Sequence, residues 1–400
     1  MAKVPQKKIP GKKVPAKKAG RQAGQIKLDV TCSRQFTSWL QEQNLSLAFT
    51  TYQAGKVFFI GSTPQGKVTV FNRNFQRVMG LCCPAPNTLW MSTLYQLWRL
   101  ENTLEPGQTS GPYDKLYVPQ VSYVTADVDA HDIAVDEKGV PIFVNTMFSC
   151  LARPSVSRSF APVWKPPFIS RLAAEDRCHL NGLAMDGFEP AYVTAIATTD
   201  VHGGWREHRR EGGVVIDVRT NDIVCEGLSM PHSPRLHNGV LYVLNSGEGY
   251  FGKVDLKTGK FEPIAFVPGY ARGMGFHGDF AIIGLSMCRE NRTFSGLNLD
   301  DALDEKKVKA RAGLQVIDLR TGDSVHFLEL KGDVRELYDV VAIPQTRAPA
   351  AVGFLTDEIR RSISIQPVEG IHPAPKKVMA GKSLQERSKE KELSGSDDES

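Results

Sequence analysis

The sequence predicts an all-β protein, a single β-propeller of six blades whose ring is closed by strands from both ends of the chain. Three observations indicate this fold: a strand-and-turn element that recurs three times, six apolar segments at blade spacing, and incomplete blades at the two ends. We expect the propeller to cover residues 31–365 of the 400 residues, since a single repeat-built all-β domain can reach this size.

The recurring element is a β-rich strand that ends in Asp-x-(Lys/Arg)-Thr-(Gly/Asn). Its aspartates lie 38 and 63 residues apart, and the longer gap holds a charged, helix-like insert near 299–311. The last residue supplies the positive φ that a tight hairpin requires. A unit of about 40–50 residues built from short strands has the spacing of a propeller blade. The element covers residues 215–221, 253–259 and 316–322.

Six short apolar segments, each preceded by polar residues, are the candidates for the innermost strands of the blades. Residues 46–72 form three strands without an innermost strand of their own, whereas Glu336–Pro344 is an innermost strand without a full blade after it. Pairing the two closes the ring and removes exposed sheet edges. Seven blades are the alternative if residues 350–355 begin a separate blade. The six segments begin near Arg77, His131, His179, His232, Arg272 and Glu336.

Four segments are expected outside the ring of blades. The segment Ser33–Gln43 predicts a short capping helix with Ser33 as its N-cap residue. Residues 154–177 are rich in proline and aromatic residues and form an excursion from the third blade. Residues 1–30 and 366–400 are expected to be disordered tails, because they are charged and poor in apolar residues.

The net charge of +5 comes from the N-terminal tail. Residues 1–27 hold nine Lys or Arg and no acid, so the rest of the chain carries 40 basic and 44 acidic residues, a net charge of −4. Such a tail either contacts a polyanion through counterion release or is a solvated extension. We favour the extension and do not expect nucleic acid as a partner, because the tail lacks the interleaved aromatic residues that stack on bases.

A cytoplasmic protein is expected. The chain contains no run of about 18 apolar residues, so we expect no membrane-spanning helix. Its first residues lack the apolar stretch of a signal peptide. The seven cysteines are scattered and form no CxxC pair, which is typical of reduced thiols. The sequence leaves the oligomeric state open.

Polar residues at the starts of the innermost strands should converge at one mouth of the central channel, where a small molecule or a peptide is the expected ligand. Two further candidates, Glu248 and Arg289, follow other apolar strands. The candidate catalytic residues are His131, Asp132, His179, Glu336 and Asp339. The candidate ligand-binding residues at the mouth are Asn181, Arg235 and Arg272.

Several chemistries are compatible with these residue types. The imidazoles of His131, His179 and His232, with carboxylates nearby, could hold a divalent metal such as Zn²⁺, Fe²⁺ or Mn²⁺. His/Asp pairs could instead act as general acids and bases without a metal, and arginines suit an anionic ligand group. A metal-assisted, hydrolase-like site is the first hypothesis. The second is a non-catalytic interaction scaffold, in which blade faces, the 154–177 excursion and the basic tail contact partners.

Two short elements resemble those of known propeller families. The string 131–139, HDIAVDEKG, resembles the Asp-Gly-Leu-Ala-Val-Asp-x-x-Gly element of the senescence-marker-protein/gluconolactonase family and of NHL-type blades. The string 180–184, LNGLA, is similar to the Asn-Gly-Leu-Ala element of the first family, although the two elements occur in inverted order. Because both elements carry metal ligands in that family, the resemblance implies ligands at Asp132 and Asn181.

A broader resemblance covers nearly all of residues 33–345. The strings LAFTTYQAGK, CHLNGLA, MPHSPR, LNSGEG, ARGMGF, GLSMCRE and VRELYDVVAIP are similar to those of an uncharacterised conserved bacterial family. That family is a domain of unknown function of the β-propeller type, sometimes attached to tetratricopeptide repeats. The resemblance implies that these polar strings belong to a family signature, and it implies no reaction.

Overall fold

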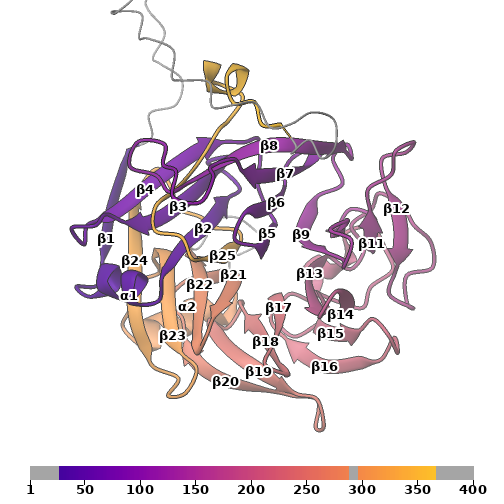
Figure 1. Ribbon diagram of the computed structural model, residues 1–400. Coiled ribbons are helices and arrows are strands. Elements are labelled where there is room, and N and C mark those ends of the chain that lie inside the picture. The colour runs from indigo at the N-terminus through magenta and orange to yellow at the C-terminus, as the bar shows by residue number, and fades with distance from the viewer. Residues whose placement is uncertain (1–26, 288–295, 366–400) are drawn as a thin grey trace, which may run out of the picture. The chain divides into compact units, whose positions relative to one another are not determined.

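The computed structural model describes residues 27–287 and 296–365, and its strands assemble into six sheets, the blades of a six-bladed β-propeller (Figure 1). The innermost strand of each blade contains or directly follows one of the six predicted apolar segments, so this prediction is confirmed. In the order of blades 1 to 6, the innermost strands are β25 (Val340–Pro344), β5 (Leu81–Ala85), β9 (Ala130–Val135), β13 (Leu180–Asp186), β17 (Pro231–His237) and β21 (Tyr270–His277).

The second strands pack around the innermost strands and form the most deeply buried layer of the blades. Their apolar side chains fill the clusters between neighbouring blades, as in the stacked pair Phe49–Phe58, whose ring centroids lie 4.9 Å apart. In blade order the second strands are β2 (Leu45–Thr51), β6 (Thr88–Ser92), β10 (Pro141–Asn145), β14 (Glu189–Ala195), β18 (Val240–Asn245) and β22 (Phe280–Ser286).

A belt of hydroxyl groups connects most blades to the next at the ends of these second strands. In five of the six blades a Ser or Thr hydroxyl donates to a backbone carbonyl at the start of the next innermost strand. Blade 4 has Ile196 at this point, packed in an apolar cluster with Met230. The donors are Thr50, Ser92, Thr146, Ser246 and Ser286, and the acceptors are the carbonyl oxygens of Met79, Ala130, Leu180, Ala271 and Leu337.

The recurring Asp-x-(Lys/Arg)-Thr-(Gly/Asn) element ends the third strands of blades 4, 5 and 6, and its predicted hairpin turns are confirmed. Each aspartate accepts a hydrogen bond from the backbone N–H two residues further on, at 2.8–2.9 Å. The last residue of each turn has a φ between 66° and 78°. In blade order the third strands are β3 (Lys56–Ser62), β7 (Gln96–Asn102), β11 (Cys150–Arg153), β15 (Gly213–Asp217), β19 (Tyr250–Asp255) and β23 (Ala312–Asp318).

The fourth strands form the outer layer of the ring. One of them corrects the sequence analysis, because part of the predicted 154–177 excursion is a strand of blade 3 and does not lie outside the ring. In blade order the fourth strands are β4 (Val68–Asn74), β8 (Lys115–Val124), β12 (Ala161–Trp164), β16 (Ile223–Leu228), β20 (Lys260–Phe266) and β24 (Ser324–Gly332).

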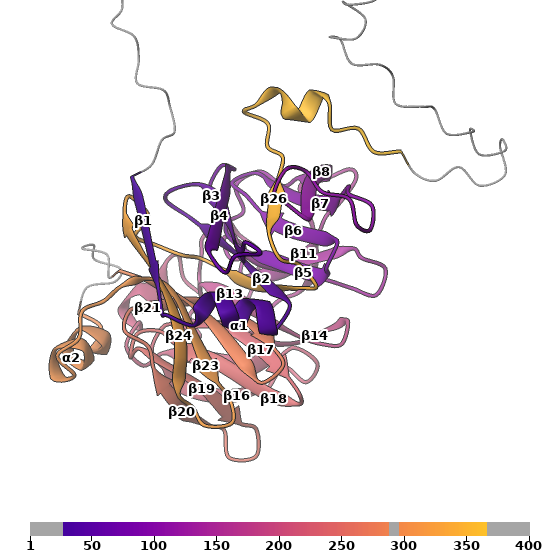
Figure 2. The same ribbon diagram turned by 60° about the vertical axis from the view of Figure 1, so that its left-hand side comes forward.

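Both ends of the described chain close or extend blades (Figure 2). Strand β25 pairs antiparallel with β2, from Leu45↔Pro344 to Phe49↔Val340, and this pairing closes the ring as predicted. Strand β1 (Leu28–Cys32) adds a fifth strand to blade 6 by pairing antiparallel with β24, so the end of the predicted basic tail is ordered. Strand β26 (Pro349–Ala351) lies parallel to β8 as a fifth strand of blade 2, which excludes the seventh blade.

Two α-helices of the described chain lie outside the blades. The first, α1 (Phe36–Glu42), packs Phe36 and Trp39 against blades 6 and 1. Its N-cap residue is Gln35, so the predicted N-cap Ser33 was wrong; the Ser33 hydroxyl pairs with Nδ1 of His326 at 3.2 Å. The second, α2 (Asn298–Glu305), confirms the predicted helical insert.

Some expectations are tested only in the described part of the chain. None of its helices is long and apolar enough to cross a membrane. Its six cysteines are free thiols, and Cys288 lies outside the described residues. The chain divides into two units after Arg361, so the blades belong to the first unit. Residues 1–26 and the predicted tail 366–400 lie outside the described residues.

Candidate functional site

The three predicted histidines come together at one mouth of the central channel. His131 is the second residue of β9, His179 directly precedes β13, and His232 is the second residue of β17. The ring centroids of His131 and His179 lie 4.8 Å apart, and all three side chains are buried. Residues at or next to the starts of three innermost strands therefore produce one imidazole cluster, in which His232 interacts electrostatically with the other two rings.

Each imidazole is held through its Nδ1 atom. Nδ1 of His131 lies 2.8 Å from the carbonyl oxygen of Asp129, and Nδ1 of His232 lies 2.7 Å from that of Met230. Because a carbonyl oxygen can only accept a hydrogen bond, Nδ1 must carry the proton in both rings. The lone pair of each neutral ring is consequently on Nε2, the nitrogen on the far side.

His179 is oriented by a carboxylate. Its Nδ1 lies 3.1 Å from both oxygens of Asp176, which also accepts a hydrogen bond of 2.8 Å from Nε1 of Trp205. Burial alone would raise the pKa of Asp176, but its contacts with His179 and Trp205 hold this pKa below its usual range. The indole ring also stacks on His179, with ring centroids 4.1 Å apart. The result is an imidazole whose Nδ1–H is fixed by an ionised carboxylate.

Burial keeps two of these imidazoles uncharged. It is the main cause that lowers the pKa of His131 to about 4, against a smaller opposing effect of Asp129. It also lowers the pKa of His232 well below its usual value, and the positive charge of Arg272 acts in the same direction. At neutral pH both rings are therefore hydrogen-bond acceptors at Nε2.

A caged arginine and two tyrosines complete the mouth. The guanidinium carbon of Arg272 lies 5.0 Å from the ring centroid of Tyr338 and 5.3 Å from that of Tyr270, both within cation–π range. Its Nη1 atom lies 3.6 Å from Oε1 of Glu336. The ring of Tyr338 also lies 5.6 Å from that of His131. The cation therefore neighbours the Tyr338 phenol, which in turn contacts the imidazole of His131.

A second group of predicted residues, from β9, β17 and the residue before β25, forms a buried ion triad. Nη1 of Arg235 lies 2.7 Å from Oδ2 of Asp132, and its Nη2 lies 3.4 Å from Oδ1 of Asp339. The carboxylates also accept backbone N–H groups of the neighbouring blades, from Leu183 to Asp132 and from Leu81 to Asp339. The triad therefore ties blades 1, 3 and 5 together and anchors blades 2 and 4.

The second carboxylate of the triad is difficult to ionise. Burial is the main cause that raises the pKa of Asp339 to about 7; Arg235 lowers it and Asp132 raises it. Beyond the triad, a cavity of about 410 Å³ is lined by Arg235 and by apolar residues of the innermost strands, such as Met274 and Phe276. The predicted site thus divides into an imidazole mouth and a structural ion triad.

The remaining predicted residues do not join the imidazole cluster through any contact seen in the described chain. Asn181 accepts a hydrogen bond from the Thr194 hydroxyl at its Oδ1, at 2.8 Å. Glu248 stays in its own turn, where Nδ2 of Asn245 donates to it at 2.8 Å. Arg289 lies outside the described residues.

Sequence reasoning missed four members of the mouth, and one of them, Tyr270, lies two residues before Arg272. Asp176 lies three residues before His179, and Tyr338 lies between Glu336 and Asp339, so spacing could have identified both. Trp205 comes from the 3-10 turn Gly204–Glu207 in the long loop between β14 and β15, and no sequence signal connects it to His179.

The metal ligands implied by the gluconolactonase-type resemblance do not fit a metal here. Both oxygens of Asp132 already accept hydrogen bonds from Arg235, and the Asn181 oxygen accepts one from Thr194. Within residues 27–287 and 296–365, no three His, Cys, Asp or Glu side chains are placed to hold one metal ion. The arrangement is suited instead to hydrogen bonding and proton transfer.

Comparisons with solved structures give distant likenesses. The chain is similar to a chain of a nidogen/laminin complex (9% identity, TM-score 0.47, covering 75% of this chain and 99% of the other). It is similar to a catalytically inactive virginiamycin B lyase from Staphylococcus aureus with quinupristin (11% identity, TM-score 0.37, covering 76% of this chain and 99% of the other). It is also similar to a luciferin-regenerating enzyme (13% identity, TM-score 0.39, covering 76% of this chain and 92% of the other). A comparison with curated proteins finds no match.

The family comparison agrees with the broader resemblance seen in the sequence. The matching family model covers residues 34–352, which includes all six innermost strands. The chain therefore belongs to the family described as "Domain of unknown function (DUF4915)".

Proposed function

We propose that the channel mouth is a small-molecule site in which neutral imidazoles accept hydrogen bonds from the ligand and His179 acts as a general base. One observation carries the proposal: His131, His179 and His232 all use Nδ1 to bond to the protein. Among the described residues, no hydrogen bond uses any of their Nε2 atoms. The unused Nε2 atoms of His131 and His232, on rings that burial keeps neutral, favour a ligand that supplies hydrogen-bond donors.

The chemistry that this geometry supports best is activation of a water molecule or a hydroxyl group. The proton moves from the ligand oxygen to Nε2 of His179, and the imidazolium that forms is stabilised by the ionised Asp176. Trp205 holds both members of this pair, through its hydrogen bond to the carboxylate and its stacking on the ring. A hydrolytic reaction follows if the activated oxygen attacks a carbonyl group.

Arg272 suits the negative charge that develops in such a reaction. Arg272 is only 6% exposed, so its charge is screened less than at the surface. The cation also makes the mouth unfavourable for a positively charged ligand. We therefore propose an uncharged or anionic ligand with hydroxyl or water-derived donors.

The first test examines the tautomers that carry the proposal. Two-bond ¹H–¹⁵N spectra of the full chain at pH 7 should show His131 and His232 as neutral rings protonated at Nδ1. Neither should titrate as the pH is lowered to 5. His237 is the control for the tautomer, because its Nε2 lies 2.9 Å from the carbonyl oxygen of Gly278 and should carry the proton instead of Nδ1. Titration of His131 near its ordinary pKa of about 6.5 would refute the proposed acceptor role.

The second test uses a panel of ester and lactone probes with the wild type and two variants. If one probe is turned over, His179→Gln and Asp176→Asn should each lower kcat by about 10²–10⁴-fold, whereas His237→Gln should leave it unchanged. Equal turnover by His179→Gln and wild type would exclude the general base. If no probe binds or reacts, the scaffold hypothesis gains support.

A further inference from the structure

A separate hollow of about 900 Å³ lies between blades 1 and 2. It is bordered by the turns that follow β2 and β6, by the connection from β4 to β5, and by the chain segment after β26. Tyr95 and Phe354 are about half exposed in it, at 45% and 49%. Clustered exposed aromatic side chains of this kind mark binding sites on protein surfaces. The aromatic residues of the lining are Tyr52, Phe75, Tyr95, Trp98 and Phe354.

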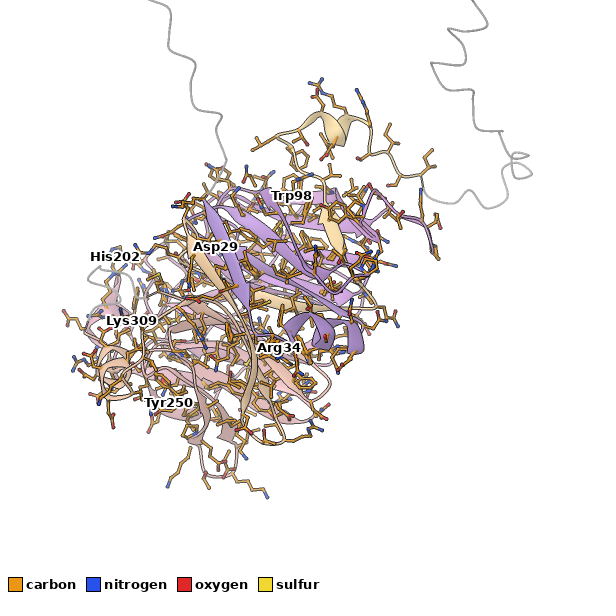
Figure 3. The ribbon with its side chains drawn as sticks, turned by 90° about the vertical axis from the view of Figure 1, so that its left-hand side faces the viewer. Asp29, Arg34, Trp98, His202, Tyr250 and Lys309 are labelled. Atoms are coloured by element: carbon orange, nitrogen blue, oxygen red, sulfur yellow. The ribbon has the colours of Figure 1, made fainter. Side chains whose placement is uncertain are left out.

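Three of these rings form one wall of the hollow. The ring centroids of Trp98 and Phe354 lie 4.8 Å apart, and that of Phe75 lies 6.4 Å from each of them. Figure 3 labels Trp98 close to the yellow C-terminal segment that carries Phe354. Phe354 packs against Trp98 and Phe75, and these contacts show that the two rings accept an aromatic neighbour.

The two cations in the lining differ in how they are paired. The guanidinium of Arg77 is bonded to Asp127 at 2.9 and 3.0 Å and to Asp129 at 2.6 Å, so its charge is compensated. Lys56 is only 4% exposed, and its ammonium donates to the side-chain oxygen of Asn74. Within the described residues, no carboxylate forms an ion pair with Lys56.

An ammonium in this position is unfavourable until an anion approaches it. Burial lowers the pKa of Lys56, because the charged form loses hydration. A bound carboxylate or sulfonate would compensate this charge with a charge-assisted hydrogen bond. The hollow therefore combines an aromatic wall for apolar rings with one uncompensated cation at the start of β3.

We propose that the hollow between blades 1 and 2 binds a small aromatic anion, with its ring beside Trp98 and Phe354 and its acidic group at Lys56. This site goes beyond the proposed function and uses none of the imidazoles. The hollow adjoins the mouth, since the ring of Tyr52 lies 6.1 Å from that of Tyr338. Its occupant is recognised by an ammonium group and aromatic rings, whereas the mouth offers imidazoles.

The experiment compares two fluorescent probes of matched shape on the full-length protein. The anionic probe is 8-anilinonaphthalene-1-sulfonate, and the uncharged probe is N-phenyl-1-naphthylamine. Saturable binding of the anionic probe to wild type is expected. Lys56→Met should weaken it about tenfold and change the uncharged probe less than twofold, whereas Lys56→Arg should retain most of the affinity. Trp98→Ala should weaken both probes.

Matched variants separate this site from general surface effects and from the mouth. Lys253→Met removes an exposed lysine, paired with Glu262 at 3.1 Å on blade 5, and should change nothing. His179→Gln should also leave both probes unaffected, because it alters only the mouth. Near-UV circular dichroism checks that each variant is folded. If Lys56→Met does not fold, the proposal is tested by the binding of both probes to Trp98→Ala and by the salt dependence of anionic-probe binding to wild type. Any of three results would overturn the proposal. The anionic probe could bind Lys56→Met and Lys253→Met equally, it could fail to bind wild type saturably, or His179→Gln could lose its binding.

Discussion

Replacing Arg235 by methionine tests whether the buried ion triad holds the ring together. The guanidinium is the one cation bonded to both Asp132 and Asp339 within the described chain, at 2.7 and 3.4 Å. Asp132 and Asp339 are 4% and 3% exposed. Methionine keeps most of the apolar stem but leaves two buried carboxylates facing each other. Removing one partner of a buried ion pair costs about 3–5 kcal/mol of unfolding free energy.

The pH dependence of this cost identifies its cause. Burial already raises the pKa of Asp339 to about 7 in the presence of Arg235, and without the guanidinium this pKa should rise further. A protonated carboxyl group removes the repulsion, so Arg235→Met should be more destabilising at pH 8 than at pH 5. The double variant Arg235→Met/Asp339→Asn should recover a part of the loss at pH 8 and show a weaker pH dependence.

Urea unfolding followed by tryptophan fluorescence, at pH 5 and pH 8, measures these differences. The control variant is Arg320→Met, which breaks the pair of Arg320 with Asp318 at the surface. Arg320 is 64% exposed, so solvent screens this pair and we expect a much smaller change than for Arg235→Met. A loss of less than about 1 kcal/mol for Arg235→Met, or an equal loss at both pH values, would refute the role assigned to the triad.

Two further predictions concern the hydroxyl belt and the buried imidazoles. Ser92→Ala should lower the unfolding free energy by about 1–3 kcal/mol, because the Ser92 hydroxyl donates to the carbonyl of Ala130 and accepts the N–H of Gly80. Ser122→Ala, at an exposed serine, is the control in the same urea titration. The pKa of His232 lies below its unfolded value, so the unfolded chain binds more protons below about pH 6.5 and stability should fall on acidification. A profile for His232→Gln as steep as that of wild type between pH 6.5 and 4.5 would contradict this account.

The fold could be predicted because its signals are local. The hairpin turns at Asp217, Asp255 and Asp318 depend on an aspartate that accepts a nearby backbone N–H and on a positive-φ residue four positions on. Such geometry needs only neighbouring residues, so sequence spacing reveals it. Ring closure was predictable for a related reason, since an unpaired innermost strand at 336–344 and an incomplete blade at 46–72 complement each other.

The errors concern contacts that depend on the final packing. Ser33 has the residue type of an N-cap, but α1 begins at Phe36 because Phe36 and Trp39 pack against blades 6 and 1. Residues 161–164 carry Pro162 and were expected outside the ring, yet they pair with β11 as an outer strand. Proline is tolerated there because an edge strand leaves one row of N–H groups unpaired.

By itself, the sequence favoured six blades and indicated the closure of the ring and the histidines at the channel mouth, whereas the pairing of β26 with β8 excluded a seventh blade. These features follow from strand periodicity and from equivalent positions in each repeat. Only the tertiary structure decided that Asp132 and Asp339 share Arg235, and that Asp176 and Trp205 orient His179. Those partnerships join blades and loops that are far apart in the chain, and they depend on the width of the channel, which no local pattern contains.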